Sequence, residues 1–449
     1  MSSLFEKATD HLHASQQLYE AANAKSRLQH EEATMSLPGG NTRSVLHASP
    51  FPLCMAFGRG NHLTDVDGHE YLDCIGDMTA GLYGHSEPLI AQTITSTLTN
   101  IGMNLGATTI AEARLAEAIC QRFVSIEQLR FCNSGTEANL YALSVARLAT
   151  GRPKVIVFEG GYHGGVLSFA NGIALNNVDK ADWIVGRYND VGHVKELISN
   201  NKDVAAAVLV EGMQGAGGCI PGTPEFLHAV QQAAKENNII FILDEVMTSR
   251  LAPGGLQSYI LHPEHRNPLS PDLTTIGKWV GGGLSIGAFG GRSDLMGVYD
   301  PRSSKISHSG TFNNNTLAMN VGYEAMKNLY TPDACLALNG LGDELRQDLN
   351  TLAQGTRMAV TGMGALMTIH FLPTGDPTQV LRKNDLTVDT ESVEAVLRDL
   401  FWFFLIKRGI WIARRGMLSL ILGTSREDTH CIKEVVRAFL GEFRELVAL

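Results

Sequence analysis

Four short apolar runs in the middle of the chain predict buried β-strands, at 154–158, 205–210, 239–243 and 273–277. Segments that read as helices lie between them. Strands that alternate with helices in this way are typical of a mostly parallel sheet with helices packed on its faces. The pattern therefore predicts an α/β fold.

Each of these predicted strands is followed directly by polar or glycine-rich residues. The four following stretches read EGGYHGG, EGMQGAGG, DEV and KWVGGG. Open α/β sheets bind ligands beyond the carboxyl ends of their strands, so we expect the four stretches to meet in one crevice. That crevice is the predicted site.

The two ends of the chain predict a second, smaller unit. The N-terminal stretch has the character of a helix, and the breaker LYTPDAC at 329–335 opens a region with helical segments, a predicted hairpin at 409–422 and a terminal helix. We expect 76–330 to form the large domain, and 331–449 to form a small α+β domain that 1–75 joins.

Composition and charge narrow the function classes. The 449 residues are 44% hydrophobic and 18% charged, which is enough for two globular units with a large core. A formal net charge of −10 and the lack of a Lys/Arg run argue against a nucleic-acid partner. The longest apolar run, at 400–406, is far shorter than the ~20 residues of a membrane span, so we expect no membrane partner.

The cysteines and the N-terminus predict where the protein works. The seven cysteines are scattered and include no C-x-x-C pair, which fits reduced thiols in an intracellular protein. The first residues lack the basic start and the apolar stretch of a signal peptide. We therefore expect a cytoplasmic protein, and no bound metal ion.

A candidate anion site begins at Ser134. Ser134 and Glu137 have the spacing of a capping box at the start of a helix. The first turn of that helix presents Gly135 and Thr136, whose backbone N–H groups and hydroxyl could hold a phosphate with the help of the helix dipole. Taken alone, the pattern more often marks an ordinary capped helix.

Lys278 is the most unusual residue of the predicted crevice. It follows the apolar run 273–277 and precedes three glycines at 281–283. A lysine after a strand is usually solvated, but here the strand is apolar enough to be buried and the glycines permit a close approach of backbone. A buried amine has to lose its charge or find a partner, and a Schiff base with an aldehyde cofactor is one such use.

Two further residues fit a cofactor of that kind. Asp244 follows the third predicted strand, where a lone carboxylate is costly unless it is paired. Its partner could be a salt bridge, a helix cap or the protonated ring nitrogen of pyridoxal phosphate. Tyr162 stands between pairs of glycines, so its ring could lie flat on another ring, although an ordinary core tyrosine fits equally well.

Six ordered motifs together resemble the class III aminotransferases, which are fold type I pyridoxal phosphate enzymes. They are DVDGHEYLD at 65–73, GH at 84–85, NSGTEAN at 133–139, GYHG at 161–164, DEVMT at 244–248 and GKWVGGG at 277–283. The resemblance covers the chain from about residue 29 onward. It implies bound pyridoxal 5'-phosphate and a homodimer with shared active sites.

The resemblance also implies a role for individual residues. Lys278 would be the catalytic Schiff-base lysine, Asp244 the partner of the ring nitrogen, and Tyr162 and Val246 would pack on the two ring faces. Thr311 would reach the phosphate from the neighbouring subunit. The full set of implied cofactor-binding residues is Ser134, Gly135, Thr136, Tyr162, Asp244, Val246, Lys278 and Thr311.

Four stretches most resemble the β-phenylalanine aminotransferases within that class: PGGNTRSVLHASPFPL, TAGLYGHS, FNNN and DEVMTSRLAP. This resemblance assigns Arg43 to the substrate carboxylate and an arginine of ARRGMLSL to a second carboxylate contact. A guanidinium fork suits a carboxylate because two parallel bonds fix its orientation. Alignment to the following glycine favours Arg415 over Arg414. Tyr83 would face the aromatic or aliphatic group of the substrate.

The implied reaction moves an amino group from a β-amino acid such as β-phenylalanine, or a related amine, to a keto acid such as 2-oxoglutarate or pyruvate. Lys278 would act as base and then as acid. Three alternatives stay open: a glutamate-1-semialdehyde aminomutase, a pyridoxal-dependent racemase of the same fold, and a non-catalytic cofactor-binding protein. Dependence on a keto acid separates amino transfer from the first two.

Overall fold

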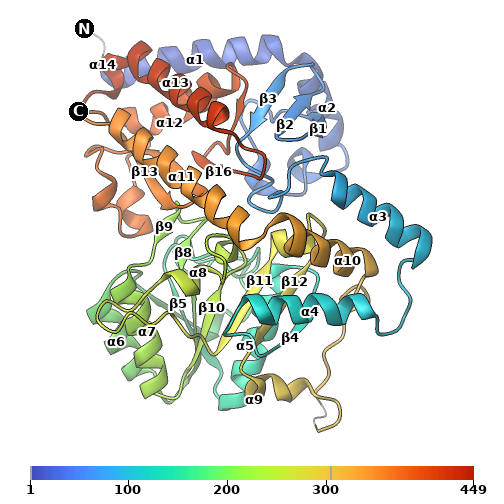
Figure 1. The fold of residues 1–449 in the computed structure, drawn as a ribbon. Coiled ribbons are helices and arrows are strands. Elements are labelled where there is room, and N and C mark those ends of the chain that lie inside the picture. The colour runs from blue at the N-terminus through green and yellow to red at the C-terminus, as the bar shows by residue number, and fades with distance from the viewer. Residues whose placement is uncertain (1–2, 304–305) are drawn as a thin grey trace.

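A seven-stranded sheet forms the centre of the larger region in the computed structural model, which describes residues 3–303 and 306–449 (Figure 1). The strands in spatial order are β4 (Gln128–Cys132), β12 (Gly287–Gly291), β11 (Leu273–Gly277), β10 (Ile240–Asp244), β7 (Ala205–Glu211), β5 (Lys154–Phe158) and β6 (Trp183–Gly186). The pairings from β11 to β6 are all parallel, and β12 is antiparallel to both of its neighbours. The predicted α/β fold and its four strands are confirmed.

Helices cover both faces of this sheet. Along β5, Val155 packs in a cluster with the apolar side of α5 (Gly135–Thr150), while Ile156 packs in another cluster with α7 (Pro224–Glu236). Successive side chains of a strand point to opposite faces, so both faces of a parallel sheet need apolar residues. This explains why every residue of β7, β10 and β11 is buried.

The parallel strands bring their carboxyl ends to one edge of the sheet. Asp244 at the end of β10 lies in register with Glu211 at the end of β7 and with Thr275 near the end of β11. Lys278 follows β11 directly. The expected convergence of the strand ends is therefore confirmed.

Both ends of the chain lie in the smaller region, in the upper part of Figure 1. Its first sheet joins β1 (Met55–Arg59), β2 (His62–Asp65) and β3 (Glu70–Asp73) to β15 (Ile410–Trp411). Its second sheet consists of β13 (Met358–Met363), β14 (Leu366–Phe371) and β16 (Met417–Ser419). The helices around them are α1 (Leu4–Ala22), α2 (Ala24–Thr34), α11 (Pro332–Leu352), α12 (Val393–Ile406), α13 (Arg426–Glu442) and α14 (Arg444–Val447). The exact domain boundaries stay predictions.

The predicted hairpin at 409–422 is wrong. Its first strand, β15, pairs with β3, and its second strand, β16, pairs with β14 in the other sheet. A turn at Gly416 connects them, with Ala413 N–H donating to Met417 O. Each strand finds a partner in a different sheet, and this long-range pairing cannot be read from local sequence.

Further helices complete the fold. They are α3 (Pro88–Asn100), α4 (Ile110–Arg122), α6 (Val191–Asn200), α8 (Leu256–Tyr259), α9 (Ser293–Met296) and α10 (Thr316–Glu324), and a short pair of strands is β8 (Met213–Gln214) with β9 (Ile220–Pro221). No helix among the described residues combines the length and the apolar character that crossing a membrane requires.

Candidate active site

Lys278 lies in a tight turn at the end of β11. Its φ of 57° is in the left-handed region, which residues other than glycine rarely adopt and which often marks a functional site. The glycines that follow allow close packing, since a Cβ atom at Gly282 would lie 2.5 Å from Val321. No hydrogen bond or ion pair joins its amine to another residue within the described ranges.

The surroundings of Lys278 favour its neutral amine. Burial lowers the pKa of Lys278 most strongly, and the positive charges of Arg415 and Arg43 lower it further, whereas the carboxylates of Asp244 and Glu211 oppose the shift. The balance is a pKa below the ordinary value for lysine. A neutral amine is the form that can act as a nucleophile or take up a proton.

Asp244 is buried and held as a carboxylate. Its Oδ2 atom lies 2.7 Å from His163 Nδ1 and accepts a 2.8 Å bond from Asn139 Nδ2, and its Oδ1 atom accepts the N–H of Val246 at 3.0 Å. Burial alone would raise the pKa of Asp244, but His163 and these hydrogen bonds outweigh burial and lower it. A permanent negative charge therefore sits at the end of β10.

Asn139 and His163 hold Asp244 in place, although no sequence pattern singled them out. Asn139 lies on α5, where it also accepts a 2.8 Å bond from Thr275 Oγ1 and donates to His163 O. Both side chains are buried. Both belong to motifs that were recognised, NSGTEAN and GYHG, but an amide on a helix and a histidine in a glycine-rich loop carry no local sign that they hold a carboxylate.

Glu211 fixes the loop that carries Tyr162. The carboxylate of Glu211 accepts the N–H of Tyr162 at 2.9 Å and that of Gly215 at 3.1 Å. Burial raises the pKa of Glu211 to about 7, against the opposing charge of His163. Tyr162 is 45% exposed, so its ring can pack against a bound molecule.

The start of α5 packs directly against the strand ends. Ser134 Oγ accepts the N–H of Glu137 at 3.2 Å, which confirms the predicted helix start. A Cβ atom at Gly135 would lie 2.6 Å from Val246, so only glycine allows this approach. Thr136 lies equally close to the Tyr162 loop, because a Cβ atom at Gly164 would lie 2.3 Å from its hydroxyl.

The two candidate arginines of the C-terminal turn differ in their partners. Arg414 makes two bonds to Asp399, of 3.0 and 2.9 Å, and donates to Ser49 O. Arg415 has no ion pair in the part of the chain that the structure describes, and its side chain donates one hydrogen bond there, to Met417 Sδ. The charge of Arg415 is among those that lower the pKa of Lys278, so Arg415 is the stronger candidate for the site.

Arg43 lies on the N-terminal segment, before β1. Its guanidinium also lowers the pKa of Lys278, and its one ion pair within the described residues is with Asp77, at 2.5 Å. Both partners are well exposed, at 43% for the Arg43 side chain and 60% for that of Asp77. Asp77 lies in a run of left-handed backbone from Gly76 to Thr79.

Two predicted site residues have no hydrogen bond to this group among the described residues. Tyr83 is only 5% exposed, and the charges that act on it belong to Arg122 and Arg250 rather than to Lys278. Its hydroxyl is buried without a hydrogen-bond partner among the described residues. Thr311 is exposed, on the segment before α10.

The assembled residues fit pyridoxal phosphate. Asp244 Oδ1 accepts only one N–H and so has room for a second, from a protonated ring nitrogen. Lys278 offers an unpartnered amine for an aldehyde, and the N–H groups of Gly135 and Thr136 have no acceptor among the described residues. Unpaired N–H groups at a helix start suit a phosphate.

Comparison with known proteins agrees with this chemistry. The class-III aminotransferase family model matches residues 45–178 and 178–397. The chain is 49% identical over 430 residues to an uncharacterized aminotransferase of Schizosaccharomyces pombe, covering 96% of this chain and 95% of the relative. It is 37% identical over 372 residues to the glutamate-1-semialdehyde 2,1-aminomutase of Rhodopirellula baltica, covering 79% and 83%.

A third relative is the β-phenylalanine transaminase of Variovorax paradoxus. It is 44% identical over 422 residues, covering 94% of this chain and 93% of that protein. The solved structure of the β-phenylalanine aminotransferase from that organism superimposes with a TM-score of 0.92 at 43% identity, over 98% of this chain and 99% of that one. The chain therefore belongs to the class III aminotransferases and is a pyridoxal phosphate enzyme.

Proposed function

We propose that this aminotransferase takes the amino group from a β-amino acid of the β-phenylalanine type and passes it to a keto acid such as 2-oxoglutarate or pyruvate. One observation carries the proposal: Arg415, beside Lys278, has no carboxylate partner among the described residues. Arg43 provides a second guanidinium whose charge acts on the Lys278 amine. Donor and acceptor both carry a carboxylate in this reaction, and both have to bind in one site.

Each residue of the site has a distinct part in the proposed reaction. Bound pyridoxal phosphate supplies an electron sink for the carbon that loses its proton. Asp244 would hold the ring nitrogen protonated, and Tyr162 and Val246 would pack on the ring. The Nζ atom of Lys278 would take the proton from the amine-bearing carbon of the donor and then deliver it to the C4′ carbon of the cofactor, so that one residue acts as base and acid.

Arg43 is well suited to exchange one carboxylate for another. Its ion pair with Asp77 is exposed, and exposed pairs contribute at most about 1 kcal/mol. A substrate carboxylate can therefore replace Asp77 at little cost, and a bidentate guanidinium–carboxylate contact would favour that exchange. In a β-amino acid the carboxylate lies one carbon further from the reacting amine than in an α-amino acid.

A homodimer with shared sites is the second part of the proposal. Thr311 lies exposed on an irregular segment, where a second copy of the chain could reach it. The resemblance to the family supports a role for Thr311 at the phosphate of the partner's site. Light scattering on the active enzyme tests this part, since an active monomer would exclude shared sites. A cytoplasmic location likewise stays a prediction.

The substrate assignment is tested by replacing Arg43. We expect Arg43→Ala to lose about tenfold or more in turnover of 3-amino-3-phenylpropanoate, because tenfold corresponds to about 1.4 kcal/mol. Turnover of 1-phenylethylamine, which lacks the carboxylate, should change much less. Arg59→Ala is the matched control, since Arg59 is an exposed arginine of β1. An unchanged ratio of the two donors in Arg43→Ala would overturn the β-amino acid assignment.

Dependence on the keto acid tests the reaction type. The proposed transfer stops after one turnover per site when no keto acid is present. Sustained conversion of an amino acid without a keto acid would instead favour an aminomutase or a racemase.

A further inference from the structure

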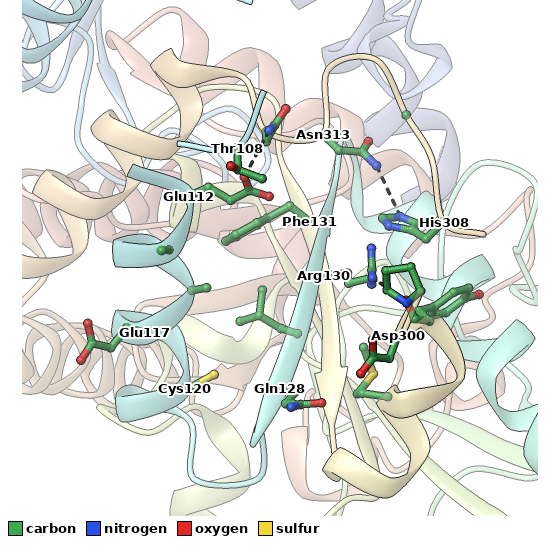
Figure 2. Close-up of a pocket in the computed structure, with 18 of the residues that line it drawn as sticks. Thr108, Glu112, Glu117, Cys120, Gln128, Arg130, Phe131, Asp300, His308 and Asn313 are labelled. Carbon is green, nitrogen blue, oxygen red and sulfur yellow. Dashed lines mark hydrogen bonds between the residues drawn. The ribbon is translucent and has the colours of Figure 1, made fainter. Parts of the chain in front are cut away.

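The segment before α10 is exposed except at a few side chains. Within 306–315, most residues are exposed, and the Phe312 side chain is 58% exposed. His308 and Asn313 are the half-buried residues on either side of Thr311. A hollow of about 850 Å³ lies between this segment, α4 and β4, so the segment lacks close packing against its own chain on that side (Figure 2).

The ring of His308 packs among the rings of Tyr141, Phe289 and Tyr299, which we call the aromatic box. Its ring lies edge-on to Tyr141 at a centroid distance of 4.4 Å and to Phe289 at 5.3 Å, and it is tilted against Tyr299 at 5.7 Å. These three rings come from α5, from β12 and from the turn after α9. Burial, with the nearby charge of Arg130, lowers the pKa of His308 to about 4, so the imidazole is neutral at physiological pH.

Asn313 connects this box to the start of α5. Its amide donates to His308 Nε2 at 3.4 Å, as Figure 2 shows, and its Oδ1 atom accepts a 3.0 Å bond from Asn133. Asn133 directly precedes the helix cap Ser134, at the first turn that we assign to the phosphate. A Cβ atom at Gly310 would lie 2.2 Å from Asn313 Oδ1, so the loop closes tightly around Thr311.

We propose that His308 is a positioning residue, which fixes the loop 308–313 through the aromatic box and Asn313 and so sets the place of Thr311. The inference rests on the proposed shared site, in which Thr311 serves the partner's cofactor phosphate. In this arrangement the exposed side of the loop contacts the partner, and the packing of its inward side against the chain is held by His308. Without this anchor the loop would sample many conformations, and each phosphate contact from Thr311 would first have to order it.

The test compares cofactor affinity with turnover. We expect His308→Ala to raise the dissociation constant of pyridoxal phosphate about tenfold, the change that the loss of one or two aromatic contacts produces, measured by absorbance on refilled apoenzyme. Turnover at saturating cofactor should change less than about twofold. His308→Phe keeps the aromatic packing and should restore most of the affinity. His13→Ala, which removes an exposed histidine of α1, is the control.

A double-mutant cycle separates positioning from a general loss of stability. If His308 acts through Thr311, the pair His308→Ala with Thr311→Ala binds the cofactor no more weakly than Thr311→Ala alone. The inference would be overturned if the two substitutions raised the dissociation constant of the cofactor by factors that multiply in the double variant. It would also be overturned if His308→Ala left that constant unchanged. If His308→Ala does not fold, Asn313→Ala replaces it in the same cycle, because it breaks the link to Asn133 without emptying the box.

Mixed dimers test the shared site separately. A dimer of one Lys278→Ala chain and one His308→Ala chain contains a single lysine-bearing site. If Thr311 acts across the interface, that site receives an intact loop from the Lys278→Ala chain and binds the cofactor with wild-type affinity. If the affinity stays at the His308→Ala value, the shared site fails, while the double-mutant cycle still decides the role of His308.

Discussion

The proposed cofactor half and the proposed carboxylate half of the site are built differently. In the cofactor half, Asp244 is buried at the end of a central strand and accepts three hydrogen bonds. In the carboxylate half, Arg43 and Arg415 stand on connecting segments, and each has at most one ion-pair partner among the described residues. The first half resists change because the core of the sheet holds it. The second half can exchange partners, as two alternating substrates require.

Removal of the Asp244 charge should cause the largest loss of activity. Asp244→Asn keeps the shape but places an amide against His163 and Asn139, so we expect activity to fall about 10³-fold, the size seen when a preorganised charge is lost. Steady-state kinetics with saturating cofactor measures it.

Asp272→Asn is the matched control for this variant. Asp272 lies at the opposite end of β11, where it pairs with Arg292 and accepts the N–H of Phe241. It should lose stability but keep its activity. Equal losses of activity in the two variants would contradict a special role for the strand ends.

The next largest effect should come from one of the two adjacent arginines of the C-terminal turn and not from the other. Arg415→Ala should lower kcat/KM for the keto acid by about 10- to 100-fold, because a charge-assisted contact contributes about 1.5 to 3 kcal/mol. Arg414→Ala should leave kcat/KM unchanged and lower the free energy of unfolding by about 1 kcal/mol, since it breaks a partly exposed pair with Asp399. The opposite assignment of effects would show that Arg414 serves the substrate.

The smallest expected effect is a pH shift that couples the two halves. The charge of Arg415 lowers the pKa of Lys278, so Arg415→Gln should raise that pKa toward its ordinary value. At a given pH less of the lysine is then neutral, and the pH profile for cofactor capture by the apoenzyme should move upward by less than about one unit. Arg414→Gln should leave the profile in place. A downward shift in Arg415→Gln would contradict the sign of this coupling.

The cofactor half could be predicted from the sequence because its residues follow apolar runs directly. A strand fixes where its end points, so Lys278 and Asp244 stood out before any packing was known. His163 and Asn139 did not, since their role arises only when α5 and the glycine loop meet Asp244. The hairpin failed for the same reason, because β15 and β16 pair with strands far away in the chain.

The carboxylate half could be predicted only in part. Resemblance pointed to Arg43 and favoured Arg415 over Arg414, and the contact of Arg414 with Asp399 agrees with that preference. Tyr83 shows the limit of the approach. Resemblance placed it against the substrate, but Tyr83 lies buried, and the charges of Arg122 and Arg250 act on it. Local sequence does not reveal which side of a loop packs inward.

The most direct test of the central claim is to locate the cofactor. We expect borohydride treatment of the yellow holoenzyme to fix one cofactor per chain, and peptide mapping to place it on the Nζ atom of Lys278. Lys278→Ala should give no stable label and no measurable amino transfer. A label on another lysine, or sustained transfer by Lys278→Ala, would contradict the assignment of Lys278 as the catalytic lysine.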